Sequence, residues 1–287
     1  MSRKKKFVLP SGVWSGPFLG FLVVTWLVVS VYFYLLKKKN RFLLFTSSGD
    51  NSRWDEFWMR ADSGDRGYDV VVVYYGSHPE EQLPRFRRAG ARGVWAHKGS
   101  KFNNLCWLHE THPEFLLPQY RYVAVWDDDV EVLPADIRRL FELTERFGLS
   151  VSMPSFSADS KLSYGPTRHK EGVLLTFTSM VEMNVPVFSR ESLGRVLAEA
   201  PDICGLTGYG ADHVYMNLLD PTHSATDRFA VVHDVVCKNP HDSEKREGVS
   251  EIDKVRPLEA RRAEWLELKS NKGLVEVEFK EYSSVLK

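Results

Sequence analysis

Two short runs of apolar, largely β-branched residues constrain the fold most. Residues 69–75 read DVVVVYY and residues 122–126 read YVAVW, and turn residues bound each run. Such runs are typical of strands that are buried on both faces. Helical patterns occur at residues 101–110 and 134–147, the second opened by Pro134. Apolar strands that alternate with helices predict an α/β fold with a mostly parallel sheet covered by helices on both faces.

The remaining expected elements extend this alternation. We expect strands at residues 41–46, 93–96, 151–153, 174–178, 185–188 and 229–232, and helices at residues 190–199 and 211–219. Ligands of open parallel sheets bind beyond the carboxyl ends of the strands. Side chains that directly follow a strand are therefore the candidates for chemistry.

The amino-terminal region has the pattern of a membrane anchor. Residues 7–36 carry no charge, and residues 18–36 are almost continuously apolar. A helix of this length spans about 28 Å, close to the hydrocarbon thickness of a bilayer. No small-residue cleavage site follows the run, which disfavours a cleaved signal peptide. We therefore expect a short basic tail at residues 1–17 and a transmembrane signal-anchor helix at residues 18–36.

The zero net charge of the 287-residue chain hides a division between its two parts. Residues 1–41 carry eight basic side chains and no acidic ones, so residues 42–287 have a net charge of −8. An acidic body argues against a nucleic-acid partner. Four basic side chains on each side of the span leave the positive-inside rule nearly tied. The short tail favours a type II, single-pass protein of the Golgi or another endomembrane.

Two further expectations concern the body. Its first predicted strand starts almost directly after the span, so we expect the body to sit close to the bilayer and to meet an acceptor presented there. Its three cysteines, Cys106, Cys204 and Cys237, allow at most one disulfide, and their spacing does not specify the pair.

The strongest candidate site is the run of three aspartates that follows residues 122–126. Adjacent carboxylates repel one another unless a cation compensates them. In an extended backbone Asp127 and Asp129 point to one side and Asp128 to the other. Such a pair suits Mg²⁺ or Mn²⁺, which prefer oxygen ligands and leave positions open for a diphosphate. A solvated acidic turn is the alternative. An EF-hand loop is excluded because Val132 stands where that loop needs glycine.

Two other acid–base side chains are candidates. His233 follows the last expected strand, where it is either a third metal ligand or a hydrogen-bonded edge histidine. Asp212 begins a predicted helix directly after two glycines. A carboxylate there is either a general base beside a closely approaching ligand or a first-turn acid stabilised by the helix dipole.

Polar residues at two more strand ends complete the set. Ser47 and Ser48 end the first strand, where a nucleotide would contact the sheet edge; a polar turn is the alternative. Lys98 and Lys101 lie between a strand and a helix, where they would neutralise phosphate or simply face solvent.

The order of these motifs resembles one protein family. The matching pieces are the Ser/Gly turn at residues 47–49, Tyr-Tyr-Gly at 74–76, VAVWDDD at 123–129, VEMNVPVFSR at 181–190, GYGAD at 208–212 and VVH at 231–233. Together they are similar to uncharacterised plant and algal proteins labelled lysine-ketoglutarate reductase trans-splicing related. That family in turn resembles glycosyltransferases of the GT-A fold.

The resemblance implies a role for each candidate. Asp127 and Asp129 would hold Mn²⁺ or Mg²⁺ on the diphosphate of a nucleoside diphosphate sugar, and His233 would complete the site. Asp212 would be the base of an inverting transfer, and Glu182 would lie on the acceptor side. A catalytic domain would occupy residues 42–237, followed by a charged extension at 238–287.

The sequence thus predicts a membrane-anchored, metal-dependent glycosyltransferase that acts on a glycan or glycoconjugate hydroxyl. One alternative is a non-catalytic, membrane-tethered module of the same fold that binds carbohydrate or a partner. A metal-dependent phosphatase or nuclease is a weaker alternative, because no second carboxylate cluster is present. Nothing in the sequence indicates the oligomeric state.

Overall fold

The structure is a computed structural model that describes residues 25–26, 40–59, 66–116, 119–199, 201–244, 252–253 and 256–287. The chain divides into two compact units, Met1–Asn40 and Arg41–Lys287. Apart from Thr25 and Trp26, the transmembrane helix expected at residues 18–36 lies outside the described residues. Among the residues that are described, no helix has the length and apolarity that a membrane span requires.

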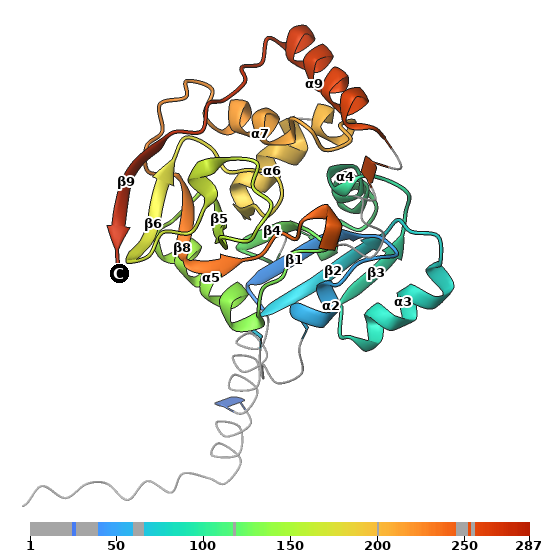
Figure 1. Ribbon diagram of the computed structural model, residues 1–287. Coiled ribbons are helices and arrows are strands. Elements are labelled where there is room, and N and C mark those ends of the chain that lie inside the picture. Colours follow the sequence, from blue (N-terminus) through green and yellow to red (C-terminus); the bar gives the residue numbers. More distant parts are fainter. Residues whose placement is uncertain are drawn as a thin grey trace, which may run out of the picture. The chain divides into compact units, whose positions relative to one another are not determined.

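The second unit is built on one large sheet (Figure 1). Within its described residues nine strands are hydrogen-bonded in the order β3-β2-β1-β4-β7-β5-β8-β6-β9. They are β1 (Phe42–Ser48), β2 (Tyr68–Tyr74), β3 (Gly93–Ala96), β4 (Tyr122–Asp127), β5 (Val151–Phe156), β6 (Val173–Thr178), β7 (Val187–Ser189), β8 (Phe229–Cys237) and β9 (Glu281–Leu286).

The sheet is mixed rather than mostly parallel, which corrects the sequence-based expectation. Strands β3, β2, β1 and β4 are parallel neighbours, and so are β5 and β8. Strand β7 is antiparallel to β4 and β5, and β6 is antiparallel to β8 and β9. An apolar run identifies a buried strand but carries no information on its direction, so the α/β class is confirmed and the parallel pattern is not.

Helices cover both faces of the sheet. They are α2 (Trp54–Phe57), α3 (Pro79–Arg88), α4 (Lys101–Thr111), α5 (Pro134–Arg146), α6 (Arg190–Glu199), α7 (Ala211–Leu219) and α9 (Leu258–Lys272). Figure 1 shows α4, α6 and α7 on one side of the sheet and α2, α3 and α5 on the other. The helices predicted at residues 190–199 and 211–219 are confirmed, whereas α3 and β9 were not predicted.

The carboxyl-terminal segment is part of the same unit as the sheet. Trp265 of α9 is 1% exposed, and its ring stacks on His213 of α7 with 5.2 Å between centroids. A Cβ atom on Gly210, which has φ +87°, would lie 2.6 Å from the Trp265 ring. Only glycine therefore allows α9 to pack here. Strand β9 then adds to the outer edge of β6.

A disulfide joins Cys106 of α4 to Cys204, the last residue of a short 3₁₀ helix at Pro201–Cys204. The third cysteine, Cys237, is buried and unpaired. The described hydrophobic core extends from Phe42 to Val277, so residues 41–287 carry a core of their own. The disulfide fixes α4 against the loop that begins at Gly205.

We expect the double substitution Cys106→Ser/Cys204→Ser to lower the free energy of unfolding by about 3 kcal/mol, because the crosslink closes a long loop in the unfolded chain. The sequence separation of the two cysteines is 98 residues. Urea unfolding of residues 41–287 measures the change, and reduction of the unsubstituted protein should reproduce it. Equal stability with and without the crosslink would contradict the prediction.

Candidate active site

A cavity of about 840 Å³ opens at the carboxyl ends of β1 and β4. Ser47 and Asp127 are register partners on these two strands, and both line it. The chain order of the strands reverses at this point, since β2 lies on one side of β1 and β4 on the other. In open α/β sheets such a reversal is where ligands bind.

Strand alternation separates the two serines at the end of β1. The hydroxyl of Ser47 accepts a hydrogen bond from Asn104 Nδ2 of α4 at 2.6 Å and lines the cavity. Ser48 points to the opposite face, where its hydroxyl accepts from Trp54 Nε1 at 3.2 Å. Ser48 is not among the lining residues, so only Ser47 is placed to meet a ligand in this cavity.

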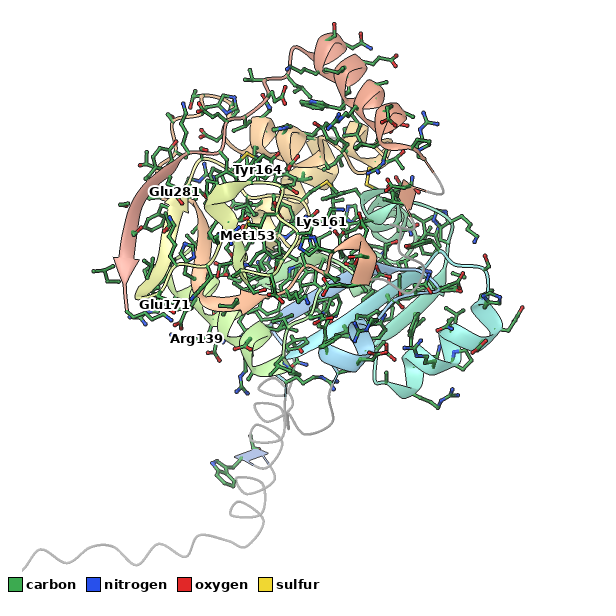
Figure 2. The ribbon with its side chains drawn as sticks, viewed as in Figure 1. Arg139, Met153, Lys161, Tyr164, Glu171 and Glu281 are labelled. Carbon is green, nitrogen blue, oxygen red and sulfur yellow. A yellow bond between two sulfur atoms is a disulfide. The ribbon has the colours of Figure 1, made fainter. Side chains whose placement is uncertain are left out.

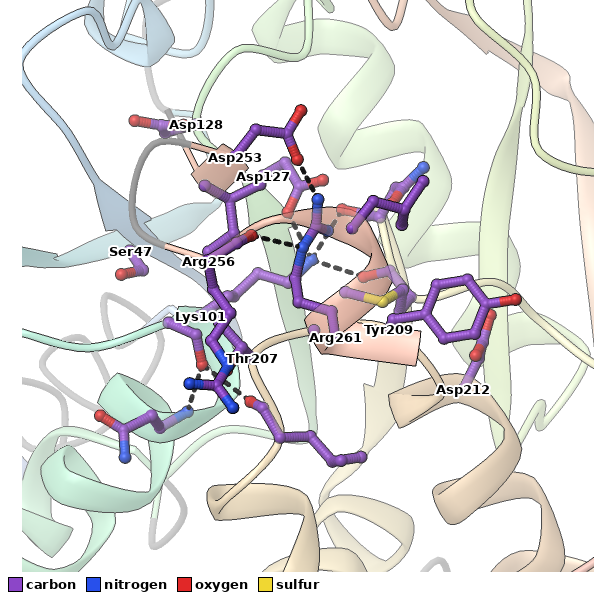
Figure 3. A pocket seen from close by; sticks show the side chains of 18 of the residues that line it. Ser47, Lys101, Asp127, Asp128, Thr207, Tyr209, Asp212, Asp253, Arg256 and Arg261 are labelled. Carbon is purple, nitrogen blue, oxygen red and sulfur yellow. Dashed lines mark hydrogen bonds and ion pairs between the residues drawn. The ribbon is translucent and has the colours of Figure 1, made fainter. Parts of the chain in front are cut away.

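A buried lysine is bound to the first aspartate of the triplet (Figure 3). Lys101 Nζ lies 2.7 Å from Asp127 Oδ1, and the two side chains are 8% and 37% exposed. The same ammonium donates to the carbonyl oxygens of Met183 and Asn184, the latter at 3.1 Å. All three protons of the ammonium thus have acceptors. Lys101 compensates Asp127 and fixes the loop that leads into β7.

The other members of the aspartate turn also line the cavity. Asp128 Oδ2 accepts a hydrogen bond from Gly49 N at 2.8 Å, which ties the turn to the end of β1. Asp129 follows it at the cavity wall. Lys98 lines the cavity as well, and its Nζ donates to the carbonyl oxygens of Tyr75 and Gly76, each at 2.6 Å.

His233 is not brought to the aspartates. It lies within β8, is fully buried, and accepts a hydrogen bond at Nδ1 from Lys170 N at 3.3 Å. Burial lowers the pKa of His233 to about 4, and the charge of Lys170 adds to this effect. Among the described residues no three His, Cys, Asp or Glu side chains are arranged to hold a metal ion. The ligand set of Asp127, Asp129 and His233 is therefore not assembled in this structure.

Two carboxyl groups form the deep end of the cavity. Glu182 is 1% exposed and Asp212 is 5% exposed, and both line it. Asn184 Nδ2 donates to Glu182 Oε1 at 3.1 Å, while Glu182 Oε2 has no hydrogen-bond partner among the described residues. Burial raises the pKa of Glu182 to about 8, and the charges of Asp212 and Asp127 add to the rise. Glu182 is therefore protonated at neutral pH.

Asp212 lies in the first turn of α7. Its Oδ1 accepts from His213 N at 3.1 Å. The hydroxyl of Tyr164, on the loop after β5 (Figure 2), lies 3.5 Å from its Oδ2. Burial raises the pKa of Asp212 above its ordinary value, and the hydrogen bond from the helix backbone opposes the rise. A buried carboxylate with a raised pKa beside an open cavity is suited to accept a proton from a hydroxyl.

Helix α9 and the residue two positions before it contribute cationic side chains that were not among the sequence-based candidates. Arg256, Arg261 and Arg262 line the cavity. Arg261 Nε donates to the carbonyl oxygen of Arg256 at 3.0 Å and pairs with Asp253 (Figure 3). The guanidinium of Arg262 lies 5.5 Å from the centroid of Tyr209. The sequence does contain one indication of these residues: Arg261 and Arg262 stand four and three positions before Trp265, so all three lie near one face of a helix.

No family model and no curated protein matches this chain. The resemblance to the lysine-ketoglutarate reductase trans-splicing related family is therefore not supported. The solved structure of S. aureus TarS 1–349 aligns with 81% of this chain and 74% of its own, at 10% identity and TM-score 0.49. The TarS 1–349 complex with UDP covers 80% and 72%, at 11% identity and TM-score 0.45.

Two other solved structures are matched over smaller shares of their own length. GalNAc-T7 with UDP, GalNAc and Mn²⁺ aligns with 73% of this chain and 44% of its own, at 9% identity and TM-score 0.49. A longer TarS structure is covered over 37% of its length. The TM-scores of all four structures lie below 0.5.

We expect Glu182→Gln to stabilise the protein increasingly as pH rises. The pKa of Glu182 is raised to about 8 from an ordinary value of 4.5, so the unfolded state alone releases the proton between these pH values. Wild-type stability therefore falls from pH 4.5 to 8, and an amide cannot titrate. At pH 8 the variant should be more stable by on the order of 3 kcal/mol, and at pH 5 nearly equal.

Urea unfolding in EDTA at pH 5 and pH 8 measures this difference. Glu80→Gln, at an exposed position in α3, is the matched control and should show no pH-dependent difference from wild type. A Glu182→Gln variant that loses stability equally at both pH values would contradict a buried, protonated Glu182.

Proposed function

We propose that this protein is a glycosyltransferase that moves a sugar from a nucleoside diphosphate sugar to a hydroxyl of a glycan or glycoconjugate. One observation carries the proposal: a single cavity at the strand-order reversal has aspartates and cationic side chains at its mouth and a buried carboxyl pair at its end. Such a cavity combines groups for a charged leaving group with a base for an incoming hydroxyl.

The donor end is the rim formed by β1, β4 and α9. Ser47 and Lys98 are placed to contact the nucleotide, and Arg256 and Arg261 to neutralise its phosphates. Mn²⁺ or Mg²⁺ would be held by Asp127 and Asp129 together with donor phosphates, since Mg²⁺ often takes only one or two protein carboxylates. When bound, the ion stabilises negative charge on the diphosphate.

The acceptor end contains the proposed catalytic base. Asp212 takes the proton of the acceptor hydroxyl while the acceptor oxygen bonds to the anomeric carbon. The bond from that carbon to the diphosphate breaks, and its electron pair leaves with the diphosphate. A single base acting opposite the leaving group gives inversion. Glu182, protonated beside Asp212, lies on the acceptor side and keeps the pair from carrying two charges.

The membrane anchor and the location belong to the same proposal. Residues 18–36 span the membrane of the Golgi or another endomembrane, with the amino terminus in the cytosol and the body in the lumen. The Cys106–Cys204 disulfide supports a lumenal body, because disulfides persist in oxidising compartments.

A non-catalytic module that binds a carbohydrate or a partner is the second candidate. The observation that favours it is the ion pair between Lys101 and Asp127, which compensates this carboxylate without a divalent ion. A module of this kind has no use for a base at Asp212. Metal-dependent nucleotide binding and base-dependent transfer therefore separate the two candidates.

We expect Asp129→Asn to weaken Mn²⁺-dependent nucleotide binding at least tenfold, because one of the two ion ligands is lost. Calorimetric titration of UDP and GDP, with Mn²⁺ and with EDTA, measures the effect. Asp129 is chosen since replacing Asp127 would leave Lys101 buried without its counter-ion. Glu80→Gln is the control. Tight nucleotide binding that is unaffected by EDTA would overturn the metal assignment.

We expect Asp212→Asn to lower the rate of sugar transfer at least a hundredfold while nucleotide affinity stays within twofold, since an amide cannot accept the proton. Nucleotide release from a panel of nucleotide sugars, with mixed glycans as acceptors, measures transfer. Glu191→Gln, an exposed carboxylate of α6, is the control. Unchanged transfer by Asp212→Asn would remove Asp212 from the catalytic role.

A further inference from the structure

The edge of the sheet opposite the cavity carries a row of arginines. Arg41, Arg121 and Arg228 directly precede β1, β4 and β8, and Arg190 directly follows the antiparallel β7. Main-chain hydrogen bonds run along this row. Arg121 N donates to Arg41 O at 2.7 Å, and Arg190 N donates to Arg121 O at 2.8 Å. Ser150 N donates to Arg228 O at 2.8 Å. The strand register thus sets these arginines side by side at the amino edge.

The row borders a groove with basic side chains and hydroxyls. The groove has a volume of about 470 Å³ and is lined by Arg121, Arg190, Arg195, Arg228 and three serines, with Glu145 and Glu191 among the other lining residues. Serine hydroxyls and guanidinium groups are donors that suit phosphate oxygens. The groove therefore has the chemistry of an anion site.

The row has more positive charge than its carboxylates compensate. Arg41 and Arg121 share one partner, Glu145, at 3.2 Å and 2.6 Å, and are 55% and 60% exposed. Arg190 and Arg228 form no ion pair with any described residue. This local excess contrasts with the net charge of −8 in residues 42–287. An acidic body that gathers more arginines than carboxylates on one edge is suited to bind an anionic surface there.

The membrane anchor predicted from the sequence would end close to this edge. Arg41 begins the row, and the apolar run of residues 18–36 ends only five residues earlier. Five residues span at most about 18 Å even when fully extended. An anchored body therefore keeps this edge within reach of the bilayer surface.

We propose that the arginine edge, defined as Arg41, Arg121, Arg190, Arg195 and Arg228, docks on anionic phospholipid headgroups of the membrane that holds the anchor. The inference rests on the membrane anchoring in the proposed function. Guanidinium groups bind phosphate oxygens in a bidentate manner, which favours arginine at such a surface.

Docking at this edge orients the cavity. Strand β1 runs from Phe42 at the arginine edge to Ser48, the residue after the cavity-lining Ser47. At about 3.3 Å per residue the two edges are roughly 20 Å apart. The cavity then faces away from the bilayer, and an acceptor reaches it from the aqueous side. In this respect the proposal differs from the sequence-based expectation that the acceptor is presented at the bilayer surface.

Vesicle sedimentation tests the proposal with residues 41–287, which carry their own core. We expect binding to phosphatidylcholine vesicles that contain phosphatidylserine, and none to phosphatidylcholine alone. Arg190→Gln/Arg228→Gln should lower the partition coefficient about tenfold, because each basic side chain at an anionic surface adds to membrane affinity. The control, Arg168→Gln/Lys272→Gln, removes two exposed cations away from this edge and should bind as wild type. Arg168 lies beside Phe156 at the carboxyl end of β5, and Lys272 of α9 pairs with Asp202.

Three results would overturn the docking surface. They are equal binding to both kinds of vesicle, an equal loss in the control variant, and displacement by millimolar inorganic phosphate beyond that caused by sodium chloride of the same ionic strength. The last result would indicate a site for a small free anion. Nucleotide binding by the same variants, and carbonate extraction of the full chain, report on the proposed function and its anchor separately.

Discussion

The ion pair between Lys101 and Asp127 is the interaction on which the candidate site depends. The pair joins the first residue of α4 to the last residue of β4. The other two protons of the Lys101 ammonium are donated to the carbonyl oxygens of Met183 and Asn184. These two hydrogen bonds fix the residues that follow Glu182 and so keep Glu182 beside the cavity. A buried ammonium without acceptors is costly, so these contacts favour the observed packing of the three segments. One lysine thus joins the aspartate turn to the loop that carries Glu182.

The parallel half of the sheet explains why two chemically different surfaces lie on one body. Strands β1, β2 and β4 all begin at one edge and end at the other, so whatever precedes each strand gathers at one edge and whatever follows gathers at the opposite one. Arg41 and Arg121 stand before β1 and β4, while Ser47 and Asp127 stand at their ends. For these parallel strands, sequence position relative to the strand is therefore enough to assign a side chain to the arginine edge or to the cavity edge.

The same rule sets the limit of what the sequence could predict. The rule correctly predicts that Ser47, Lys98 and the aspartates lie at one cavity, because apolar runs in the sequence show where the strands end. It failed to separate Ser48 from Ser47, since that distinction depends on which face of β1 meets α4. It also failed for His233. Strand β8 continues to Cys237, so the histidine lies within the strand rather than at its end.

The carboxyl-terminal segment could not be placed from sequence because its contacts are few, specific and distant along the chain. Helix α9 is largely polar, and a single buried side chain, Trp265, docks it on Gly210. That contact requires Gly210, which lies some fifty residues earlier in the chain, and no local sequence pattern predicts such a distant contact.

The packing of Trp265 on Gly210 also determines which α9 side chains reach the candidate site. Because Trp265 packs on the residue that precedes α7, α9 is held where Arg261 and Arg262 line the cavity. The charged tail is therefore a wall of the candidate active site, and it adds the positive charges of Arg261 and Arg262 to those of Lys98 and Lys101.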